Sequence, residues 1–203
     1  MSTVAPKQAE LPLVLALDIG TSSVRAVLFD RLGRTVEGLE ARQAYELHTT
    51  VDGASEACPD ALLEGVWDCV DGVLAKTGGL TGQISGVATC TLVSNLLGVD
   101  KTGRAVTPLT TYADTRSADE VAGLRADCNE AAVHDRTGCH FHPGYLPARF
   151  RWLARAQPDL FHQVARWVSI GEYLELKLFG EAAVSYSVAS WTGLLDRHRL
   201  VWD

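Results

Sequence analysis

The chain has 203 residues, of which 47% are hydrophobic and 21% are charged, and its formal net charge is −7. This composition is typical of a globular protein with a substantial core. The acidic balance argues against nucleic acid or an anionic membrane as a partner, and no apolar run approaches the roughly 20 residues that a membrane-spanning helix needs.

Three strands are predicted at the start of the chain. Residues 1–12 are expected to form a flexible tail, and apolar runs predict strands over residues 13–18 and 23–30. A turn at residues 31–34 leads into a third strand over residues 35–47. Consecutive strands joined by short turns predict an antiparallel meander.

Helices and strands alternate in the rest of the chain. An apolar stripe at helical spacing predicts a helix from Pro59 to about Ala75. A buried strand is predicted over residues 84–90, and another over residues 95–99. The later predictions begin with a turn at 100–103 and a helix that follows Asp114 and runs through Ala118 to about Ala126. Further helices are predicted over 129–136, over 144–160 with its end at Pro158, and over 171–179. A strand is predicted over 167–170, and a turn or short helix with a strand pair over 187–203. This mixture predicts an α/β layer architecture, with a mixed sheet flanked by helices.

The turn between the first two strands has the composition of a phosphate site. Gly20 lets backbone N–H groups converge on an anion, and the hydroxyls of Thr21, Ser22 and Ser23 can donate to phosphate oxygens. Asp18 ends an apolar strand, where Mg²⁺ or its waters would offset the cost of an unpaired buried carboxylate. In isolation the same residues also fit an ordinary hairpin with a polar turn.

The surrounding segment, LALDIGTSSVRAVLFD, resembles the first phosphate motif of the acetate-kinase, hexokinase and actin superfamily. Four further stretches, in the expected order, resemble the FGGY carbohydrate kinases, and the last two are most similar to the gluconate-kinase branch. They are ISGVATCTLVSNLLGVD, TPLTTYADTR, TGCHFHPGYLPARFRWL and VSIGEYLELKLFG with SYSVASWTGLLDRHRLVWD. The second resembles the P-x-x-x-W-x-D-x-R segment of the family, with Tyr112 in place of Trp.

The resemblance covers nearly the whole chain after residue 12 and implies a ribonuclease H-like, actin-like ATPase domain. It implies a kinase that transfers the γ-phosphoryl group of ATP, with Mg²⁺, to a hydroxyl of a sugar or of a sugar acid such as gluconate. Residues 13–203 would be the N-terminal, sugar- and phosphate-binding domain, and the C-terminal domain that binds adenosine has no counterpart in the sequence. We therefore expect weak or no turnover from the chain alone. The expected partners are a C-terminal kinase half, or a second copy bound through the exposed cleft face.

Individual roles also follow from the resemblance. Asp18 corresponds to the Mg²⁺-associated carboxylate, and Asp114 and Arg116 correspond to a polar pair beside the sugar. Arg116 would bind an acid or hold Asp114 in place. Ser94 and Asn95, with Tyr112, fall where the family has groups that contact the sugar. These roles compete with simpler ones, because the Asp–Arg pair also fits a helix N-cap with a surface ion pair, and the Ser–Asn pair fits a polar turn.

One replacement affects the expected chemistry. In the gluconate-kinase branch the last motif begins with an Asp that the resemblance assigns as the catalytic base, and Ser185 occupies that position. A serine hydroxyl cannot act as a base near neutral pH, and loss of a general base typically costs ~10²–10⁴-fold in rate. Glu181, four residues upstream, is the nearest substitute. Two hypotheses stay open: a kinase domain that acts with a C-terminal half, and a pseudokinase that binds a sugar or nucleotide without transfer. A structural actin-like or chaperone-like domain fits less well, because the second and third stretches belong to the sugar side.

Cysteine, histidine and arginine residues complete the sequence predictions. The five cysteines form no CxxC pair, which favours a reduced, cytoplasmic protein. Residues 139–142, Cys-His-Phe-His, lack the second ligand pair of a common zinc site, so we expect a loop or a wall on the substrate side. Arg149, Arg151 and Arg155 are predicted to lie on the solvated side of a helix.

Overall fold

The computed structural model describes residues 2–203, which divide into two compact units. Unit 1 comprises the residues up to Glu46 together with Asp60–Leu92, and unit 2 comprises Leu47–Pro59 and Val93–Asp203. The chain therefore leaves the first unit after residue 46, returns to it at residue 60 and leaves it again after residue 92.

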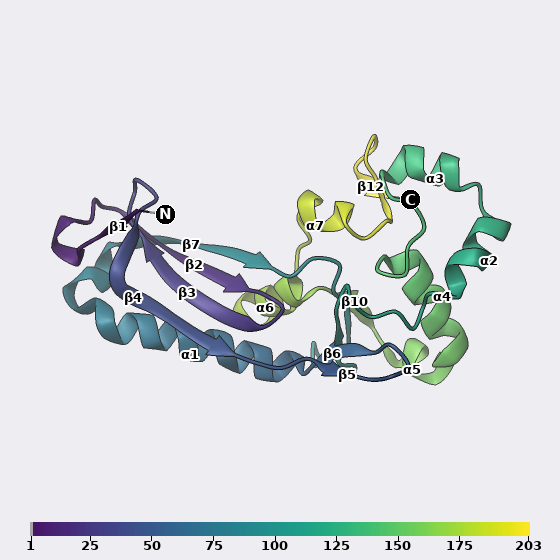
Figure 1. The fold of residues 1–203 in the computed structure, drawn as a ribbon, viewed down its shortest axis with the longest axis horizontal. Helices are drawn as coiled ribbons and strands as arrows, with labels where there is room; N and C mark the ends of the chain where they lie inside the picture. The colour runs from purple at the N-terminus through teal and green to yellow at the C-terminus, as the bar shows by residue number, and fades with distance from the viewer. Residues whose placement is uncertain (1) are drawn as a thin grey trace. The chain divides into compact units, whose positions relative to one another are not determined.

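Unit 1 is built on a five-stranded sheet in the order β1-β4-β3-β2-β7 (Figure 1). Its centre is an antiparallel meander of β2 (Leu13–Ile19), β3 (Ser23–Phe29) and β4 (Thr35–Ala44). Strand β7 (Ile84–Thr91) runs parallel to β2. The mixed sheet and its opening meander confirm the fold class that the sequence predicts.

The N-terminal segment contributes a strand of its own. Strand β1 (Thr3–Val4) pairs in parallel with β4, and Val4 is buried. A short 3₁₀ helix, η1 (Pro6–Gln8), follows it. Part of the segment that we expected to be a flexible tail is thus paired with the sheet.

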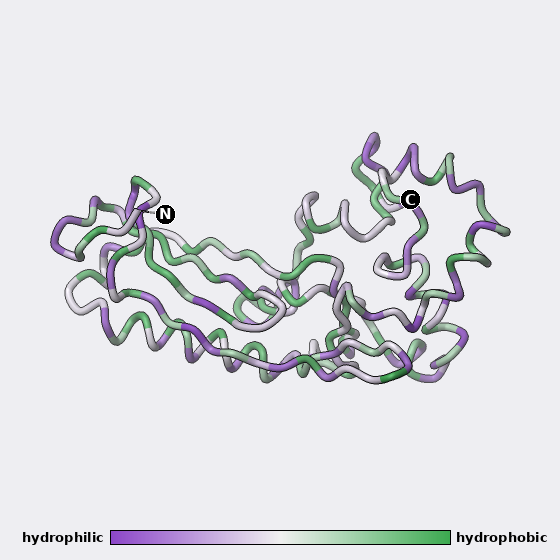
Figure 2. Tube along the Cα trace, viewed as in Figure 1, coloured by the Kyte–Doolittle hydropathy of each residue, from purple (hydrophilic) through white to green (hydrophobic). Residues whose placement is uncertain are grey.

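Helix α1 (Pro59–Thr77) packs on the sheet of unit 1 through its hydrophobic side. Hydrophobic and hydrophilic residues alternate along it in Figure 2, as expected of an amphipathic helix. A Cβ on Gly65 would lie 3.7 Å from the Val24 side chain, and Lys76 Nζ donates to the Glu40 carbonyl at 2.8 Å. The side chains that bury this face are Leu62, Leu63, Val66, Cys69 and Val73.

Strand β7, which follows the 3₁₀ helix η2 (Gly78–Gln83), is less buried than its sequence predicts. Its apolar run predicts a buried strand over residues 84–90, but Val87 is 59% exposed. Among the described residues β7 pairs with β2 alone, so it is an edge strand. Burial depends on what lies beside and above a strand, which the run of apolar residues does not reveal.

Unit 2 combines three small sheets with six helices. One sheet has the strand order β5-β6-β9, and the other two are the antiparallel pairs β8–β10 and β11–β12. The strands are β5 (His48–Thr49), β6 (Ser55–Ala57), β8 (Leu97–Val99), β9 (Leu109–Thr110), β10 (Arg166–Val168), β11 (Leu195–Asp196) and β12 (Val201–Trp202). The helices are α2 (Glu120–Asp127), α3 (Glu130–Thr137), α4 (Leu146–Ala156), α5 (Pro158–Gln163), α6 (Ile170–Phe179) and α7 (Tyr186–Ser190).

Local signals fix most of these helix ends. Ser169 and Glu172 form a capping box at the start of α6, and Gly180 ends that helix with a φ of 75°. The helix predicted over residues 144–160, with Pro158 as its end, corresponds to α4, and Pro158 begins a second helix, α5, that was not predicted. No helix within residues 2–203 is both long enough and apolar enough to cross a bilayer.

Candidate functional site

The tip of the β2–β3 hairpin in unit 1 is exposed and rich in donors. The Gly20 N–H donates to the Ser23 carbonyl at 3.0 Å and closes the turn, and the Tyr45 hydroxyl donates to the Gly20 carbonyl. Within residues 2–203, neither the backbone N–H nor the hydroxyl of Thr21 or Ser22 makes a hydrogen bond. A Cβ on Gly20 would meet nothing closer than 3.5 Å. The tip therefore offers two N–H groups and two hydroxyls to an anion, with room for close approach.

Asp18 lies on β2 between neighbours from both adjacent strands. It pairs in register with Arg25 of β3 and with Cys90 of β7. Arg25 Nη2 forms an ion pair with Asp18 Oδ2, and Cys90 Sγ lies 3.7 Å from Oδ1. The Asp18 side chain is 36% exposed, so it is not the unpaired buried carboxylate that the sequence suggests. Burial, followed by the charge of Asp18, raises the pKa of the Cys90 thiol.

The hairpin fits Mg²⁺ only together with a phosphate ligand. The described residues contain no group of three or more His, Cys, Asp and Glu side chains that could hold a metal ion. Mg²⁺ is commonly held by one or two carboxylates plus phosphate oxygens and waters, and Asp18 is suited to that role. Ser23, which we also predicted to bind phosphate, is the first residue of β3 and is 6% exposed, so it is not one of the exposed groups at the tip.

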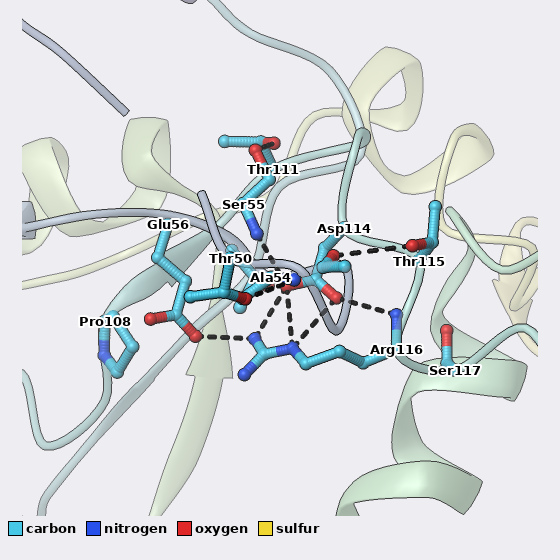
Figure 3. Close-up of polar contacts among 12 residues, drawn as sticks. Thr50, Ala54, Ser55, Glu56, Pro108, Thr111, Asp114, Thr115, Arg116 and Ser117 are labelled. Carbon is cyan, nitrogen blue, oxygen red and sulfur yellow. Dashed lines mark hydrogen bonds and ion pairs between the residues drawn. The ribbon is translucent and has the colours of Figure 1, made fainter. Parts of the chain in front are cut away.

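In unit 2, Asp114 and Arg116 form a largely buried ion pair before α2 (Figure 3). Arg116 Nη2 lies 2.6 Å from Asp114 Oδ2, and Nε lies 3.1 Å from both carboxylate oxygens. The backbone N–H groups of Ser55 and Arg116 donate to the same carboxylate at 3.3 and 3.1 Å. The alternative helix N-cap role is wrong, because α2 begins only at Glu120. The Asp114 carboxylate thus accepts hydrogen bonds from Ser55 and Arg116.

Arg116 also joins this pair to two other elements. Its Nη2 lies 2.5 Å from Glu56 Oε1 on β6, and its guanidinium lies 4.7 Å from the ring centroid of Trp152 on α4 (Figure 3 shows the polar contacts). Burial acts to lower the pKa of Arg116, but the hydrogen bonds and charges of Asp114 and Glu56 outweigh it, and the pKa is raised. Of the two roles predicted for Arg116, the contacts favour holding Asp114 in place.

Arg149 is a buried cation that the sequence prediction placed wrongly at the surface. It is 4% exposed and donates to the carbonyls of Thr111 and, at 3.4 Å, Pro143. Burial lowers its pKa to about 10. Arg151 and Arg155 are more exposed, and both form ion pairs with the buried carboxylate of Glu120. A helix rotates about 100° per residue, so a side chain two positions before Arg151 faces the other side. The unequal spacing of the three arginines is the signal that could have revealed this.

Ser94 and Asn95 both hold backbone groups within unit 2. Asn95 is 7% exposed, and its Oδ1 accepts from the Ile170 N–H at 2.7 Å, at the start of α6. Ser94 has a φ of 48°, and its hydroxyl donates to the Trp191 carbonyl at 3.1 Å. These contacts make the pair part of the packing of unit 2 rather than a freely exposed polar turn.

Ser185 is the N-cap of α7. Its hydroxyl oxygen accepts from the Val188 N–H at 3.2 Å. Asp and Ser are similarly good N-caps, because either side chain supplies an oxygen to the same orphan N–H group. A Ser in place of an Asp here therefore preserves a structural contact. Glu181, the possible substitute, is exposed.

The predicted residues fall into two groups by position. The phosphate residues, from Asp18 to Ser23, lie in unit 1. The predicted sugar residues and Ser185 lie in unit 2. Tyr112, the replacement in the second motif, is 44% exposed and stacks on His142.

Comparison with protein families gives one match over most of the chain. The family model described as the N-terminal domain of the FGGY family of carbohydrate kinases matches residues 13–203. A gluconokinase of Bacillus subtilis (strain 168) is 28% identical over 195 residues, a match that covers 94% of this chain and 36% of the relative. An autoinducer-2 kinase of Enterobacter sp. (strain 638) is 32% identical over 192 residues, and its match covers 93% of this chain and 36% of the relative.

Solved structures give the same picture. Xylulose kinase from Rhodospirillum rubrum superposes with a TM-score of 0.88 at 27% identity, covering 94% of this chain and 39% of that one. Gluconate kinase from Lactobacillus acidophilus superposes with a TM-score of 0.86 at 24% identity, which shows a shared fold, and the match covers 96% of this chain and 38% of that one. The chain spans about 36% of the length of the curated relatives above.

Proposed function

The chain belongs to the FGGY family of carbohydrate kinases, matching its N-terminal domain, and on this premise we propose that it supplies the phosphate hairpin and part of the sugar-binding surface of a sugar kinase. The reaction is transfer of the γ-phosphoryl group of ATP to a hydroxyl of a sugar or sugar acid. The observation that carries the proposal is the hairpin tip, with free N–H and hydroxyl groups on Thr21 and Ser22. Such a cluster of donors is suited to an anion and not to an apolar ligand.

Each group at the hairpin has a distinct task in this proposal. Thr21 and Ser22 donate to the phosphate oxygens, and Gly20 leaves space for them to come close to the backbone. Asp18 holds Mg²⁺ directly or through water, while Arg25 keeps its carboxylate in place. Mg²⁺, when bound, neutralises charge on the transferred phosphoryl group. Phosphoryl transfer depends mainly on positioning and charge neutralisation, so a rigid hairpin is an appropriate support.

In unit 2 we propose different roles for three of the predicted sugar residues. Tyr112, which is exposed, contacts the substrate. Asp114 and Arg116 lie beneath and hold the loop that carries Tyr112, since their polar groups are bonded to one another and to Ser55 and Glu56. Gluconate or a similar sugar acid is the substrate that we favour, because gluconokinases are among the relatives.

We infer that transfer by this chain is weak, because Ser185 stands at the position of the expected base and a serine hydroxyl cannot take up the proton near neutral pH. Its oxygen instead caps α7 by accepting from the Val188 N–H, a contact that Asp would also make. A C-terminal kinase segment is the expected partner, because the chain spans about 36% of the length of its relatives, and ATP and Mg²⁺ are the expected cofactors. A cytoplasmic location is supported by the five free cysteines.

The alternative function is a pseudokinase, which binds a sugar or nucleotide without transfer. A phosphorylation assay over polyols, ketoses and aldonic acids, with ATP and Mg²⁺, separates the two for the native chain and for Ser185→Asp. We expect transfer by the native chain near the detection limit and a gain of about 10²-fold or more in Ser185→Asp, which restores a carboxylate at the position of the expected base. No transfer by either form, with sugar binding intact, would contradict the kinase proposal for this chain and favour the pseudokinase.

Binding tests the function of the native chain directly. In calorimetric titrations we expect saturable binding of D-gluconate or of another member of the same panel. Failure of every sugar, polyol and sugar acid to bind would contradict the proposed sugar surface.

A further inference from the structure

Tyr112 belongs to an aromatic cluster in unit 2 that the sequence motifs do not explain. Its ring is stacked on the imidazole of His142, with centroids 5.3 Å apart and planes 7° from parallel. Tyr145 closes the cluster at 6.3 Å from Tyr112 and 5.6 Å from His142, tilted against both. Tyr112 is nevertheless 44% exposed. The imidazole stacks on one face of the ring, so the exposed 44% belongs to the surface that His142 and Tyr145 leave uncovered.

The backbone beside the cluster leaves space for this stack. A Cβ on Gly144 would lie 2.5 Å from Cε2 of Tyr112 and 3.1 Å from Nδ1 of His142. Any other residue at position 144 would therefore displace the tyrosine ring. The Gly144 N–H donates to His142 Nδ1 at 3.0 Å, which fixes the plane of the imidazole.

The two segments that carry Tyr112 and His142 both accept hydrogen bonds from the same buried cation, Arg149. Arg149 donates to the carbonyl of Thr111, next to Tyr112, and to the carbonyl of Pro143, next to His142. The Ser117 hydroxyl donates to the same Pro143 carbonyl at 2.9 Å. These hydrogen bonds hold the segments that carry Tyr112 and His142 at a fixed separation.

We propose that His142 is a positioning residue, which holds the orientation of the Tyr112 ring so that its exposed surface contacts the carbon skeleton of a sugar or sugar acid. This inference rests on the proposed function. A sugar has apolar C–H surfaces between its hydroxyls, and a rigid aromatic ring offers a flat apolar surface at little cost in conformational entropy. His142 acts through Tyr112 and does not need to touch the substrate.

The test uses the 203-residue chain and its variants His142→Ala, His142→Phe and Tyr112→Leu. The control is His140→Ala, which removes a 70% exposed imidazole that stacks on His134 instead. Proton NMR of the histidine rings reports the stack, because the Tyr112 ring current shifts the His142 ring protons upfield. Calorimetry with D-gluconate, or with whichever compound of the panel binds most tightly, reports the substrate contact. Thermal unfolding of each variant separates loss of binding from loss of folding.

We expect the upfield shift in the native chain and its loss in Tyr112→Leu. We expect His142→Ala to weaken binding by about two- to tenfold, the range that an aromatic pair supports. His142→Phe keeps a flat ring and should restore most of the affinity, and His140→Ala should not change it. A merely structural role would lower the thermal stability of His142→Ala without this rescue of affinity by Phe.

Two results would overturn the inference while the proposed function stands. One is that the native chain binds the sugar acid and His142→Ala binds it with the same affinity. The other is a set of His142 ring protons that do not respond to Tyr112→Leu. A native chain that binds no sugar, polyol or sugar acid would contradict both the proposed function and the inference. This result comes from the native chain alone, so it is distinguished from a failure of the variants.

Discussion

At the scale of single residues, several side chains to which the family resemblance assigns a role at the site make structural contacts in this chain. Ser185 caps a helix, Asp114 is surrounded by donors from its own chain, and Asn95 bonds to the start of α6. Resemblance to a family assigns roles by position, whereas a contact shows which atoms a side chain already occupies. The residues that keep unused donors, Thr21 and Ser22, are the better candidates for ligand contacts.

The role of Ser185 predicts a stability effect. Ser185→Ala should destabilise the fold by about 1 kcal/mol, because it leaves the Val188 N–H without its acceptor. Ser185→Asp should stay close to the native stability, since Asp is an equally good N-cap. Urea unfolding followed by circular dichroism measures both. Ser187→Ala is the control, because that hydroxyl makes no hydrogen bond within residues 2–203. Equal losses in Ser185→Asp and Ser185→Ala would argue against the capping role.

The pair formed by Asp114 and Arg116 predicts a larger effect. Their side chains are 8% and 14% exposed, so Arg116→Ala leaves a buried carboxylate without its cation. The expected loss is about 3–5 kcal/mol in urea unfolding. The matched control is Arg104→Ala, whose ion pair with Asp100 is at the surface and whose loss should cost less than about 1 kcal/mol. Similar losses in the two variants would contradict the structural role of the buried pair.

At the scale of elements, the meander and the helices are predictable because their signals are local. Apolar periodicity, Gly180 after α6 and Pro158 before α5 act within a few residues of the elements that they define. Exposure of β7 is not predictable in this way, because it depends on which segments pack beside and above the strand. The same holds for Asp114 and Arg116, whose respective partners Ser55 and Glu56 are far away in the sequence.

The turn between β3 and β4 predicts a dependence of stability on pH. The side chain of Arg34, then backbone N–H groups of Arg34, Glu10 and Leu32, hold the pKa of Asp30 well below its usual range, against the opposing effect of burial. Since the pKa is lower in the folded chain than in the unfolded chain, Asp30 stabilises the fold above about pH 4 and loses this effect as the pH falls further.

Urea unfolding of the native chain and of Asp30→Asn at pH 7, 4 and 3 measures this effect. The native chain should be more stable at pH 7, and the difference should shrink toward pH 3. A difference that does not change with pH would show that the carboxylate charge of Asp30 has no part in it.

At the scale of the whole molecule, the chain corresponds to about a third of the length of its relatives and carries two groups of candidate residues in two units. Large apolar side chains are exposed in unit 2. They include Phe179, Tyr186, Trp191 and Trp202. Exposed apolar surface of this kind favours association.

We therefore expect the chain to self-associate as its concentration rises. Sedimentation velocity over a hundredfold range of concentration should show a rising mean sedimentation coefficient. Trp191→Ser and Trp202→Ser should reduce it, since each removes a half-exposed indole. A constant monomeric value across the range would contradict this expectation.

The central claim is that the β2–β3 hairpin binds phosphate, and NMR of the ¹⁵N-labelled chain during titration with Mg²⁺–ATP tests it most directly. The account predicts saturable shifts of the Thr21 and Ser22 amides, which weaken in Gly20→Ala because a methyl group fills the approach. Gly86→Ala is the control, since its Cβ meets nothing within 4 Å, and it should titrate like the native chain. Amides at the tip that stay unmoved at saturating Mg²⁺–ATP, or that shift equally in Gly20→Ala, would contradict the claim.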